Sequence, residues 1–307
     1  MIICCGEALI DMLPRKMPDG ESALLPVAGG AVYNTAIALG RLGVETGFFS
    51  GLSTDMFGRQ LLQELERSHV DSSFCVRSDR PTTLAFVELT NGHAKYVFYD
   101  EQTALRMLAP TDLPQLDDDV EALHFGAISL ISEPCGSTYE ALLLREADRR
   151  VISLDPNIRA NFIPDADSHR QRMHRMIAKS DIIKVSDEDL AWLEPDRDAD
   201  TAIEGWLAGG AAIVVVTRGA KGASSTTRSG KIDVPSQRIE VVDTVGAGDS
   251  FDAGFLAGIK QAGRLSKAGL RAITADELEA ALHLAASVAA VTVSRAGANP
   301  PWKSELG

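Results

Sequence analysis

The chain has 307 residues and a formal net charge of −13, with 30 lysines and arginines against 43 aspartates and glutamates. It carries no long basic run, which argues against nucleic acid or an anionic membrane as the partner. Hydrophobic residues make up 45% of the chain and charged residues 24%, which is typical of a globular protein with a sizeable core.

The N-terminus and the cysteines indicate a protein of the cytoplasm. The stretch MIICCGEALIDML lacks a basic leader and contains Glu7 and Asp11, so it is predicted to be a first strand rather than a signal peptide. None of the four cysteines lies in a CxxC pair, and buried, reduced thiols are expected. The longest apolar run, residues 282–293, is too short and too polar to span a membrane.

Short runs rich in Ile and Val alternate along the chain with longer helical patterns. The predicted strands are residues 2–5, 46–51, 122–127, 151–155, 181–185 and 212–217. The predicted helices are residues 32–42, 57–68, 137–149, 167–178, 187–193, 201–208, 249–262 and 276–293. This alternation predicts an α/β fold with a mostly parallel central sheet and helices on both faces. Ser137 and Glu140 have the spacing of a capping box that opens a helix.

Two segments interrupt the alternation. Residues 12–28 are irregular and rich in turn-forming residues, whereas residues 82–100 contain two strand-like runs around Asn91-Gly92, a strong hairpin signal. A hairpin from one segment and a strand from the other would form a small β-lid over the sheet edge. Since no linker or repeat divides the chain, we predict a single domain, residues 1–307, with a lid built from about residues 12–28 and 82–100.

The stretch DTVGAGDSFDAGF, residues 243–255, turns through glycines and then begins a helical pattern. The amides of Gly246, Ala247 and Gly248 would lie at a helix N-terminus, where an anion such as a phosphoryl group binds well. Asp249 follows and could accept the proton of an attacking hydroxyl, as phosphoryl transfer requires. The alternative is that Asp249 only flanks the helix start. No GxxxxGK[ST] occurs, which excludes a Walker-type site.

A second candidate site lies in the N-terminal third of the chain. Gly29 and Gly30 precede a predicted helix and would leave amides free for a polar ligand. Asn34, in the first turn of that helix, can both donate and accept hydrogen bonds, and Asp11 after the first strand can accept them. An ordinary capping or loop role is the alternative for both side chains.

Three more junctions follow predicted strands, at the edge where open parallel sheets bind ligands. In VISLDPNIRANF, the Asp-Pro-Asn sequence favours a turn, and Arg159 follows that turn. KVSDEDLAWL places Lys184 at a strand end, where it could contact phosphate, and its Ser186 and Asp189 have the spacing of a helix cap. VTRGAKGASS is a glycine-punctuated turn that could hold nucleotide phosphates or be a plain hairpin turn.

The chain resembles the ribokinase-like (PfkB) family of sugar kinases, and among them the bacterial fructokinases. DTVGAGDSFDAGF is similar to the C-terminal signature of the family and GGAVYNTAIALGRLG to the N-terminal one. GEALIDML, DPNIR and TRGAKG also fall in family order, so the resemblance covers essentially the whole chain. It implies a ribokinase-like fold, with Asp249 as the catalytic base and the turn Gly246, Ala247 and Gly248 as the anion hole for the γ-phosphate.

The resemblance also implies the remaining ligands. The implied sugar-binding residues are Asp11, Gly29, Gly30, Asn34 and Arg159. The implied ATP site comprises Thr217, Gly219, Gly222 and the segment around Ala286, beside Lys184. Relatives commonly have Asn and Glu in place of Ser186 and Asp189, in a motif linked to Mg²⁺ and phosphate, so Asp189 would act through water. Many relatives bind a monovalent cation such as K⁺ near the loop that holds Asp243 and Val245.

The activity implied is the phosphorylation of a small sugar by ATP, with D-fructose giving D-fructose 6-phosphate. The alternatives are 2-keto-3-deoxygluconate, whose kinases share the DPNIR-like turn, adenosine as a less expected acceptor, and a sugar-binding sensor without turnover. The intact Asp249 and its glycine turn argue against the sensor. A lid with unpaired strand edges invites dimerisation, as in relatives.

Overall fold

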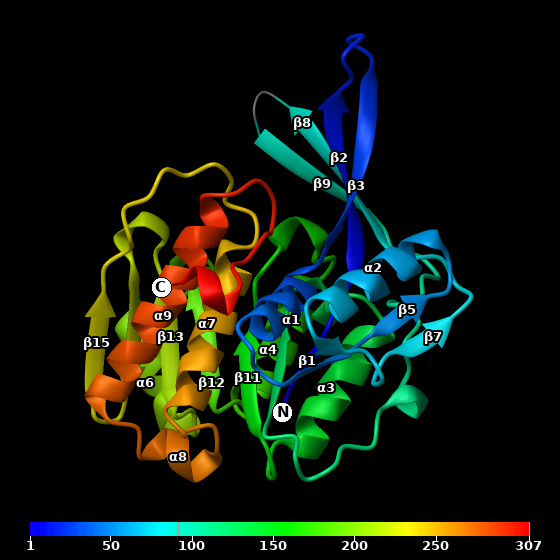
Figure 1. Cartoon of the computed structure of the whole chain (residues 1–307). Helices are drawn as coiled ribbons and strands as arrows, with labels where there is room; N and C mark the ends of the chain where they lie inside the picture. Colours follow the sequence, from blue (N-terminus) through cyan, green and yellow to red (C-terminus); the bar gives the residue numbers. More distant parts are fainter. Residues whose placement is uncertain (91–92, 307) are drawn as a thin grey trace.

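The central sheet contains all six predicted strands. The computed structural model describes residues 1–90 and 93–306, and within them nine strands lie in the order β15-β14-β13-β12-β11-β10-β1-β4-β6 (Figure 1). The parallel strands are β1 (Ile2–Cys5), β4 (Thr46–Phe49), β6 (Val70–Asp71), β10 (Ala122–Gly126), β11 (Val151–Asp155), β12 (Ile182–Ser186) and β13 (Ile213–Thr217). The antiparallel strands at one edge are β14 (Ala223–Thr227) and β15 (Gly230–Val234).

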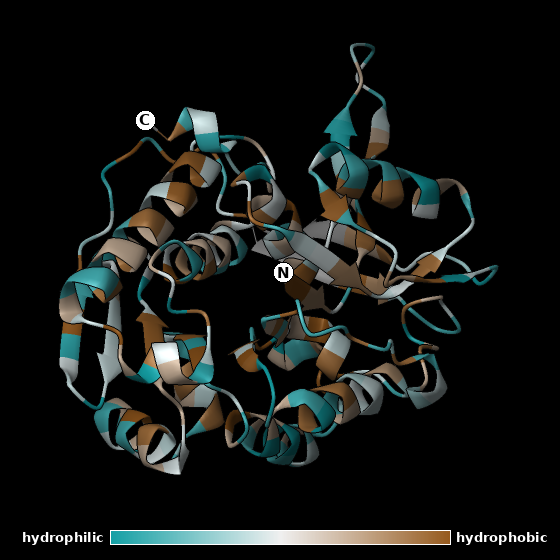
Figure 2. Cartoon of the chain, turned by 60° about the horizontal axis from the view of Figure 1, so that its bottom comes forward, coloured by the Kyte–Doolittle hydropathy of each residue, from teal (hydrophilic) through white to brown (hydrophobic). Residues whose placement is uncertain are grey.

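Helices cover both faces of this sheet, which confirms the predicted α/β fold. One face carries α1 (Ala31–Arg41), α2 (Met56–Arg67), α7 (Ala247–Gln261), α8 (Lys267–Arg271) and α9 (Ala275–Val293). The other face carries α3 (Cys135–Glu146), α4 (Ala166–Ile177), α5 (Asp187–Leu193) and α6 (Ala199–Gly209). Successive strand residues point to opposite faces, so Ile2 packs in the first layer and Ile3 in the second. Figure 2 shows the resulting pattern of hydrophobic strands inside and hydrophilic outer helix faces.

The predicted capping box at Ser137 is wrong. Helix α3 begins at Cys135, so Ser137 lies inside its first turn. The carboxylate of Glu133 accepts hydrogen bonds from the Ser137 amide (3.2 Å) and hydroxyl (3.0 Å). Glu140 instead accepts from Arg172 and Arg175 of α4, so a tertiary ion pair replaces the local cap.

A four-stranded second sheet stands above the carboxyl ends of the central strands, in the order β3-β2-β8-β9 as far as the chain is described (Figure 1). Its strands are β2 (Leu9–Lys16), β3 (Ser22–Gly29), β8 (Leu84–Thr90) and β9 (His93–Tyr99). β8 and β9 pair antiparallel, as the sequence predicts, and the turn signal Asn91-Gly92 lies outside the described residues. We call these four strands the lid sheet.

The prediction that residues 12–28 are irregular is wrong, since they form most of the β2–β3 hairpin. The hairpin projects from the molecule, and its residues 12–28 are all half-buried or exposed, so the alternation that reveals a strand is missing there. Pro14 and Pro26 further weaken the strand signal, because proline is uncommon within strands. Both are tolerated, because β3 is an edge strand and β8 pairs with β2 only at residues 10–12.

The remaining elements are short. A separate two-stranded sheet joins β5 (Gly51–Ser53) and β7 (Val76–Ser78). Single 3₁₀ turns are η1 (Pro110–Asp112), η2 (Ala127–Leu130), η3 (Ala160–Phe162), η4 (Gly219–Lys221) and η5 (Lys303–Glu305). No helix in the described part of the chain combines the length and apolar character that crossing a bilayer requires.

Candidate active site

Asp249 and Asn34 meet although they lie 215 residues apart in the chain. The side-chain amide of Asn34 in α1 donates a hydrogen bond of 2.8 Å to Oδ2 of Asp249 in α7. Thr35 donates from its hydroxyl to the backbone carbonyl of Asp249 at 3.2 Å, which ties the two helices together at the same point. Both Asp249 and Asn34 are buried, so neither is a surface residue, and Asp249 lies in the first turn of α7.

The surroundings of Asp249 suit a general base. Burial raises the pKa of its carboxyl to about 6, while the hydrogen bond from Asn34 and the positive charge of Lys184 oppose that rise. The negative charge of Asp155 adds to it. A base whose pKa lies close to neutral pH is ionised and still takes up a proton readily.

The glycine turn before Asp249 is open to an anion. Gly246 begins α7 in a left-handed conformation with φ 77°, and a Cβ placed on it would lie 2.7 Å from Cβ of Ala298. The amides of Gly248 and Asp249 find no acceptor among the residues that the structure describes, whereas the Ala247 amide donates to Thr244 at 3.3 Å. Free amides and the dipole of a 15-residue helix therefore point at one place.

A buried ionic cluster lies directly beneath this turn. Nζ of Lys184 in β12 lies 2.8 Å from Oδ2 of Asp155 and 3.4 Å from Oδ2 of Asp252. A Cβ placed on Gly248 would lie 3.1 Å from the same Nζ. The ammonium of Lys184 therefore lies where its positive charge could support a phosphoryl group held by the turn.

The pKa values of Lys184 and Asp252 are both raised in this cluster. Burial alone lowers the pKa of Lys184, but the two carboxylates outweigh burial and raise it. Burial raises the pKa of Asp252 far above that of an ordinary carboxyl, and the charge of Asp155 adds to the effect. The sequence prediction missed Asp252. Its signal was its spacing, because residues three apart share a helix face and Asp252 follows Asp249 by three.

Asp11 and Gly29 lie against each other in the lid hairpin. Asp11 belongs to β2 rather than to a loop after the first strand, and a Cβ on Gly29 would lie 2.2 Å from its Oδ2. Burial raises the pKa of Asp11 to about 6, and the charge of Asp249 contributes, so the two carboxylates face the same space. This arrangement can offer Asp11 to a sugar hydroxyl.

The amides of Ala31 and Val32, which follow Gly29-Gly30 at the start of α1, are not free for a ligand. Oε1 of Glu7 accepts from Ala31 (2.8 Å) and from Val32 (3.4 Å), and its Oε2 accepts from Ser129 (3.3 Å). Gly30 is needed for this contact, since its φ is 113° and a Cβ would lie 2.7 Å from the Glu7 carbonyl. Burial raises the pKa of Glu7 to about 7. The sequence prediction missed Glu7, because a single carboxylate after a strand has no pattern.

Arg159, Ser186 and Asp189 form a second polar group beside the cluster. Nη1 of Arg159 donates to the carbonyl of Ile158 (3.1 Å) and acts on Asp249 through its charge. Ser186 caps α5 by accepting from the Asp189 amide (3.0 Å), as its spacing predicts. Oδ1 of Asp189 accepts from Ile158 (3.1 Å), and burial followed by the charge of Asp155 raises its pKa. These contacts hold the loop after β11 to the start of α5.

The residues predicted for the nucleotide lie at the end of β13, in the turn that follows it and on α9. Thr217 ends β13 and donates to the Val185 carbonyl (3.4 Å), while Gly219 (φ 51°) and Gly222 (φ 88°) shape the turn that follows. Ala286 lies on α9, which packs along α7.

Asp243 stabilises the loop that precedes the glycine turn. Its Oδ1 accepts from the Val245 amide (3.1 Å) and its Oδ2 from Gly297 (2.9 Å). The loop is therefore attached to the segment after α9, and Val245 is exposed.

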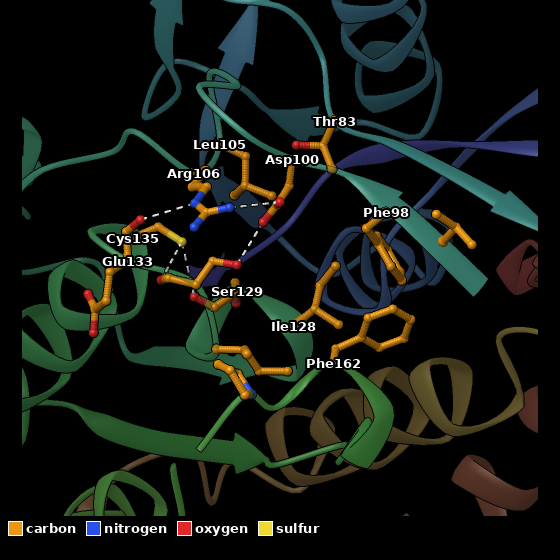
Figure 3. A pocket seen from close by; sticks show the side chains of 14 residues that line it. Thr83, Phe98, Asp100, Leu105, Arg106, Ile128, Ser129, Glu133, Cys135 and Phe162 are labelled. Atoms are coloured by element: carbon orange, nitrogen blue, oxygen red, sulfur yellow. Dashed lines mark hydrogen bonds and ion pairs between the residues drawn. The ribbon is translucent and has the colours of Figure 1, made fainter. Parts of the chain in front are cut away.

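A pocket of about 580 Å³ lies under the lid sheet and contains none of the predicted site residues (Figure 3). Phe98 of β9 and Phe162 of η3 meet edge to face at one end, with ring centroids 4.5 Å apart. Asp100, Arg106 and Ser132 form the other end. Ser129 lines the pocket and donates its amide to Glu7, so one residue separates the pocket from the start of α1.

Comparison with known proteins agrees with this geometry. Residues 1–305 match the model of the pfkB family carbohydrate kinases. The chain is 61% identical over 267 residues to a fructokinase of Rhizobium leguminosarum bv. trifolii, covering 87% of this chain and 82% of that protein. The fructokinase of Xylella fastidiosa with bound ATP superposes with a TM-score of 0.92 at 30% identity, covering 99% of this chain and 96% of that chain.

A further solved structure is a double mutant of the Vibrio cholerae fructokinase with fructose, ADP and potassium ion bound. It matches with a TM-score of 0.84 at 25% identity and covers 97% of this chain and 93% of that chain. The family model spans nearly the whole chain, and the relatives are covered over most of their length. The chain therefore belongs to the pfkB family of carbohydrate kinases.

Proposed function

We propose that the protein transfers the γ-phosphoryl group of ATP to D-fructose and releases D-fructose 6-phosphate and ADP. The observation that carries this proposal is the position of Asp249, a buried carboxylate beside the free amides of Gly248 and of Asp249 itself at the start of α7. The similarity of the chain to fructokinases, including the one solved with ATP and the one solved with fructose and ADP, supports the choice of both substrates.

The catalytic groups of the chain divide into a base and an anion cradle. Asp249 takes the proton of the sugar hydroxyl as that oxygen attacks the phosphorus. The amides of the turn and the ammonium of Lys184 stabilise the negative charge on the transferred group. Asp11, Gly29, Gly30 and Asn34 hold the sugar from the lid side, with Arg159 reaching it from the loop after β11. Closure of the lid sheet excludes water, which otherwise competes as acceptor.

Thr217, Gly219, Gly222 and Ala286 bind ATP in this proposal, and Mg²⁺ accompanies it. Mg²⁺ usually reaches protein through one or two carboxylates, several waters and the substrate phosphates. Asp189 fits that pattern, because it is largely buried and lies close enough to Asp155 for the charge of Asp155 to raise its pKa. The ion would supply positive charge to the phosphates.

We also propose K⁺ near Asp243 and Val245, since the Vibrio cholerae structure holds a potassium ion and both oxygens of Asp243 already fix this loop. Replacing K⁺ by choline in the assay buffer tests this part. The account expects a clear loss of turnover that returns when K⁺ is restored, and unchanged turnover would refute it.

The protein is proposed to act in the cytoplasm as a homodimer formed through the lid sheet. The four cysteines are unpaired, as expected in a reducing compartment. Leu24 and Leu25 on the edge strand β3 are 46% and 47% exposed, and an edge strand with exposed leucines is suited to pairing with a second copy.

A panel of acceptors tests the activity. ADP release is measured with ATP and Mg²⁺ in the presence of fructose, ribose, 2-keto-3-deoxygluconate or adenosine. The proposal predicts that fructose gives the highest kcat/KM. Faster turnover of another acceptor would change the substrate and keep the chemistry. Sugar binding without ADP release from any acceptor would favour a sensor.

A further inference from the structure

The pocket under the lid sheet has one apolar end and one ionic end (Figure 3). At the ionic end, Nη1 of Arg106 lies 2.9 Å from Oδ1 of Asp100, and Nε of Arg106 donates to the carbonyl of Glu133 at 3.2 Å. The hydroxyl of Ser132 donates to the other oxygen of Asp100 at 2.7 Å. Each oxygen of Asp100 therefore accepts one hydrogen bond and keeps a lone pair for another, and the guanidinium of Arg106 is held in place on two sides.

The charges that face this space cancel. Among the described residues of the pocket wall, Asp100, Arg106 and Glu133 carry the full charges. The carboxylate of Glu133 points away from Arg106 in Figure 3 and pairs with Arg172 of α4. What remains toward the pocket is one carboxylate and one guanidinium in direct contact, with side chains 23% and 33% exposed.

The pocket adjoins the groups assigned to the sugar. Its Ser129 amide donates to Glu7, which holds the first amides of α1, the helix of Asn34. Its Phe162 belongs to the same loop as Arg159. A volume of about 580 Å³ lies within the range of small-molecule sites. In this assignment, the part of an acceptor that points away from Asp249 enters the pocket.

We infer that the Asp100–Arg106 ion pair selects neutral sugars and rejects sugar acids as phosphoryl acceptors. This inference rests on the proposed function, because it assigns the pocket to the acceptor. A neutral sugar offers hydroxyls that can donate to the carboxylate and accept from the guanidinium. A sugar acid brings its carboxylate against Asp100 while the charge of Arg106 is already compensated. Specificity of this kind comes from repulsion of the wrong ligand as well as attraction of the right one.

Asp100→Asn tests the inference with little change in shape. The asparagine still offers an oxygen to Ser132 or Arg106, but the positive charge of Arg106 is no longer compensated. We expect the ratio of kcat/KM for 2-keto-3-deoxygluconate to kcat/KM for fructose to rise on the order of tenfold. The double variant Asp100→Asn with Arg106→Gln removes the cation as well, and the ratio is expected to return toward that of the parent.

Asp118→Asn is the matched control. It also removes a carboxylate that faces an arginine, Arg149 at 3.0 Å, but on the exposed surface, and the ratio should not change. An unchanged ratio in Asp100→Asn, or an equal rise in the double variant, would overturn the inference. A parent enzyme that prefers the sugar acid would overturn it too.

Failure of the proposed function gives a different result. If the parent phosphorylates neither acceptor, calorimetry with the same two sugars measures the ratio of their dissociation constants instead. A shift of that ratio toward the acid in Asp100→Asn would support the charge selection although the fructokinase proposal had failed. An unshifted ratio would refute both.

Discussion

Asp249 carries its charge where water is largely excluded, and this sets the pH at which it can act. Burial raises its pKa to about 6, so the ionised base is lost as the pH falls below that value. We predict that kcat/KM for fructose falls on the acid side with an apparent pKa near 6. In the free enzyme this profile reports the essential base.

Asn34→Ala should move the acid limb of the kcat/KM profile to higher pH. The amide of Asn34 donates to the ionised carboxylate and therefore lowers the pKa of Asp249. Hydrogen bonds to charged groups are worth about 1.5 kcal/mol or more, so the limb should shift to higher pH by about one unit. A pH–rate profile of the variant checks this. A limb that stays in place would show that Asn34 does not act on the base.

The ionisation of Asp249 also makes the free energy of unfolding depend on pH. The pKa of Asp249 is about 6 in the folded chain against an ordinary value of 3.8, so its ionisation costs folding free energy as pH rises through this window. The cost at pH 8 is on the order of 3 kcal/mol or less. Asp249→Asn should therefore raise the free energy of unfolding at pH 8 and raise it much less at pH 4.5. Urea denaturation at both pH values measures this, and an equal loss at both would contradict it.

The sequence predicted the groups that we propose to react better than the residues that support them. Asp249, Asn34 and the glycine turn belong to long motifs, and the structure brings the two side chains into contact. Glu7 and Asp252 were missed because their roles depend on partners far away in the chain, Ser129 and Lys184. Such partners become neighbours only once the sheet has formed, and the only local signal of the two was the spacing of Asp252 from Asp249.

At the scale of elements, the glycine turn fixes where α7 begins. Gly246→Ala forces a side chain into a left-handed backbone and against Ala298. We predict a loss of about 1–3 kcal/mol in unfolding free energy and a kcat at least about tenfold lower, because the amides of the cradle move.

Gly263→Ala is the control for this change. Gly263 also has a positive φ, 67°, but a Cβ on it would meet no atom within 4 Å. It should lose about 1 kcal/mol of stability and keep its kcat, which separates backbone strain from the position of the amides. Equal kcat values in the two variants would refute the role of the turn.

Strands in the core and strands in the lid sheet differed in how well the sequence predicted them. The runs of Ile and Val in β11, β12 and β13 are buried on both faces, and each was predicted within a residue or two. Residues 12–28 of β2 and β3 show no strand pattern in the sequence, because this part of the hairpin has no fully buried residue. A strand segment without fully buried residues leaves little hydrophobic alternation in the sequence.

At the scale of the whole molecule, the lid sheet offers the surface on which two copies would pair. Leu24→Lys places a charge on the exposed edge strand β3 and should convert a dimer to a monomer. Sedimentation velocity at several protein concentrations measures the change, with Leu144→Lys as the control. Leu144 is similarly exposed, at 45%, but lies on α3 in the body of the protein. A monomeric parent would refute the dimer.

The most direct test of the account is the turnover of Asp249→Asn beside the parent, with fructose, ATP and Mg²⁺ at saturating concentrations. Asparagine keeps the shape and can still accept from Asn34, but it cannot take the proton. General-base catalysis contributes about 10²–10⁴-fold, and kcat should fall by that factor while the circular dichroism spectrum is unchanged. A folded variant with turnover close to that of the parent would show that Asp249 is not the base.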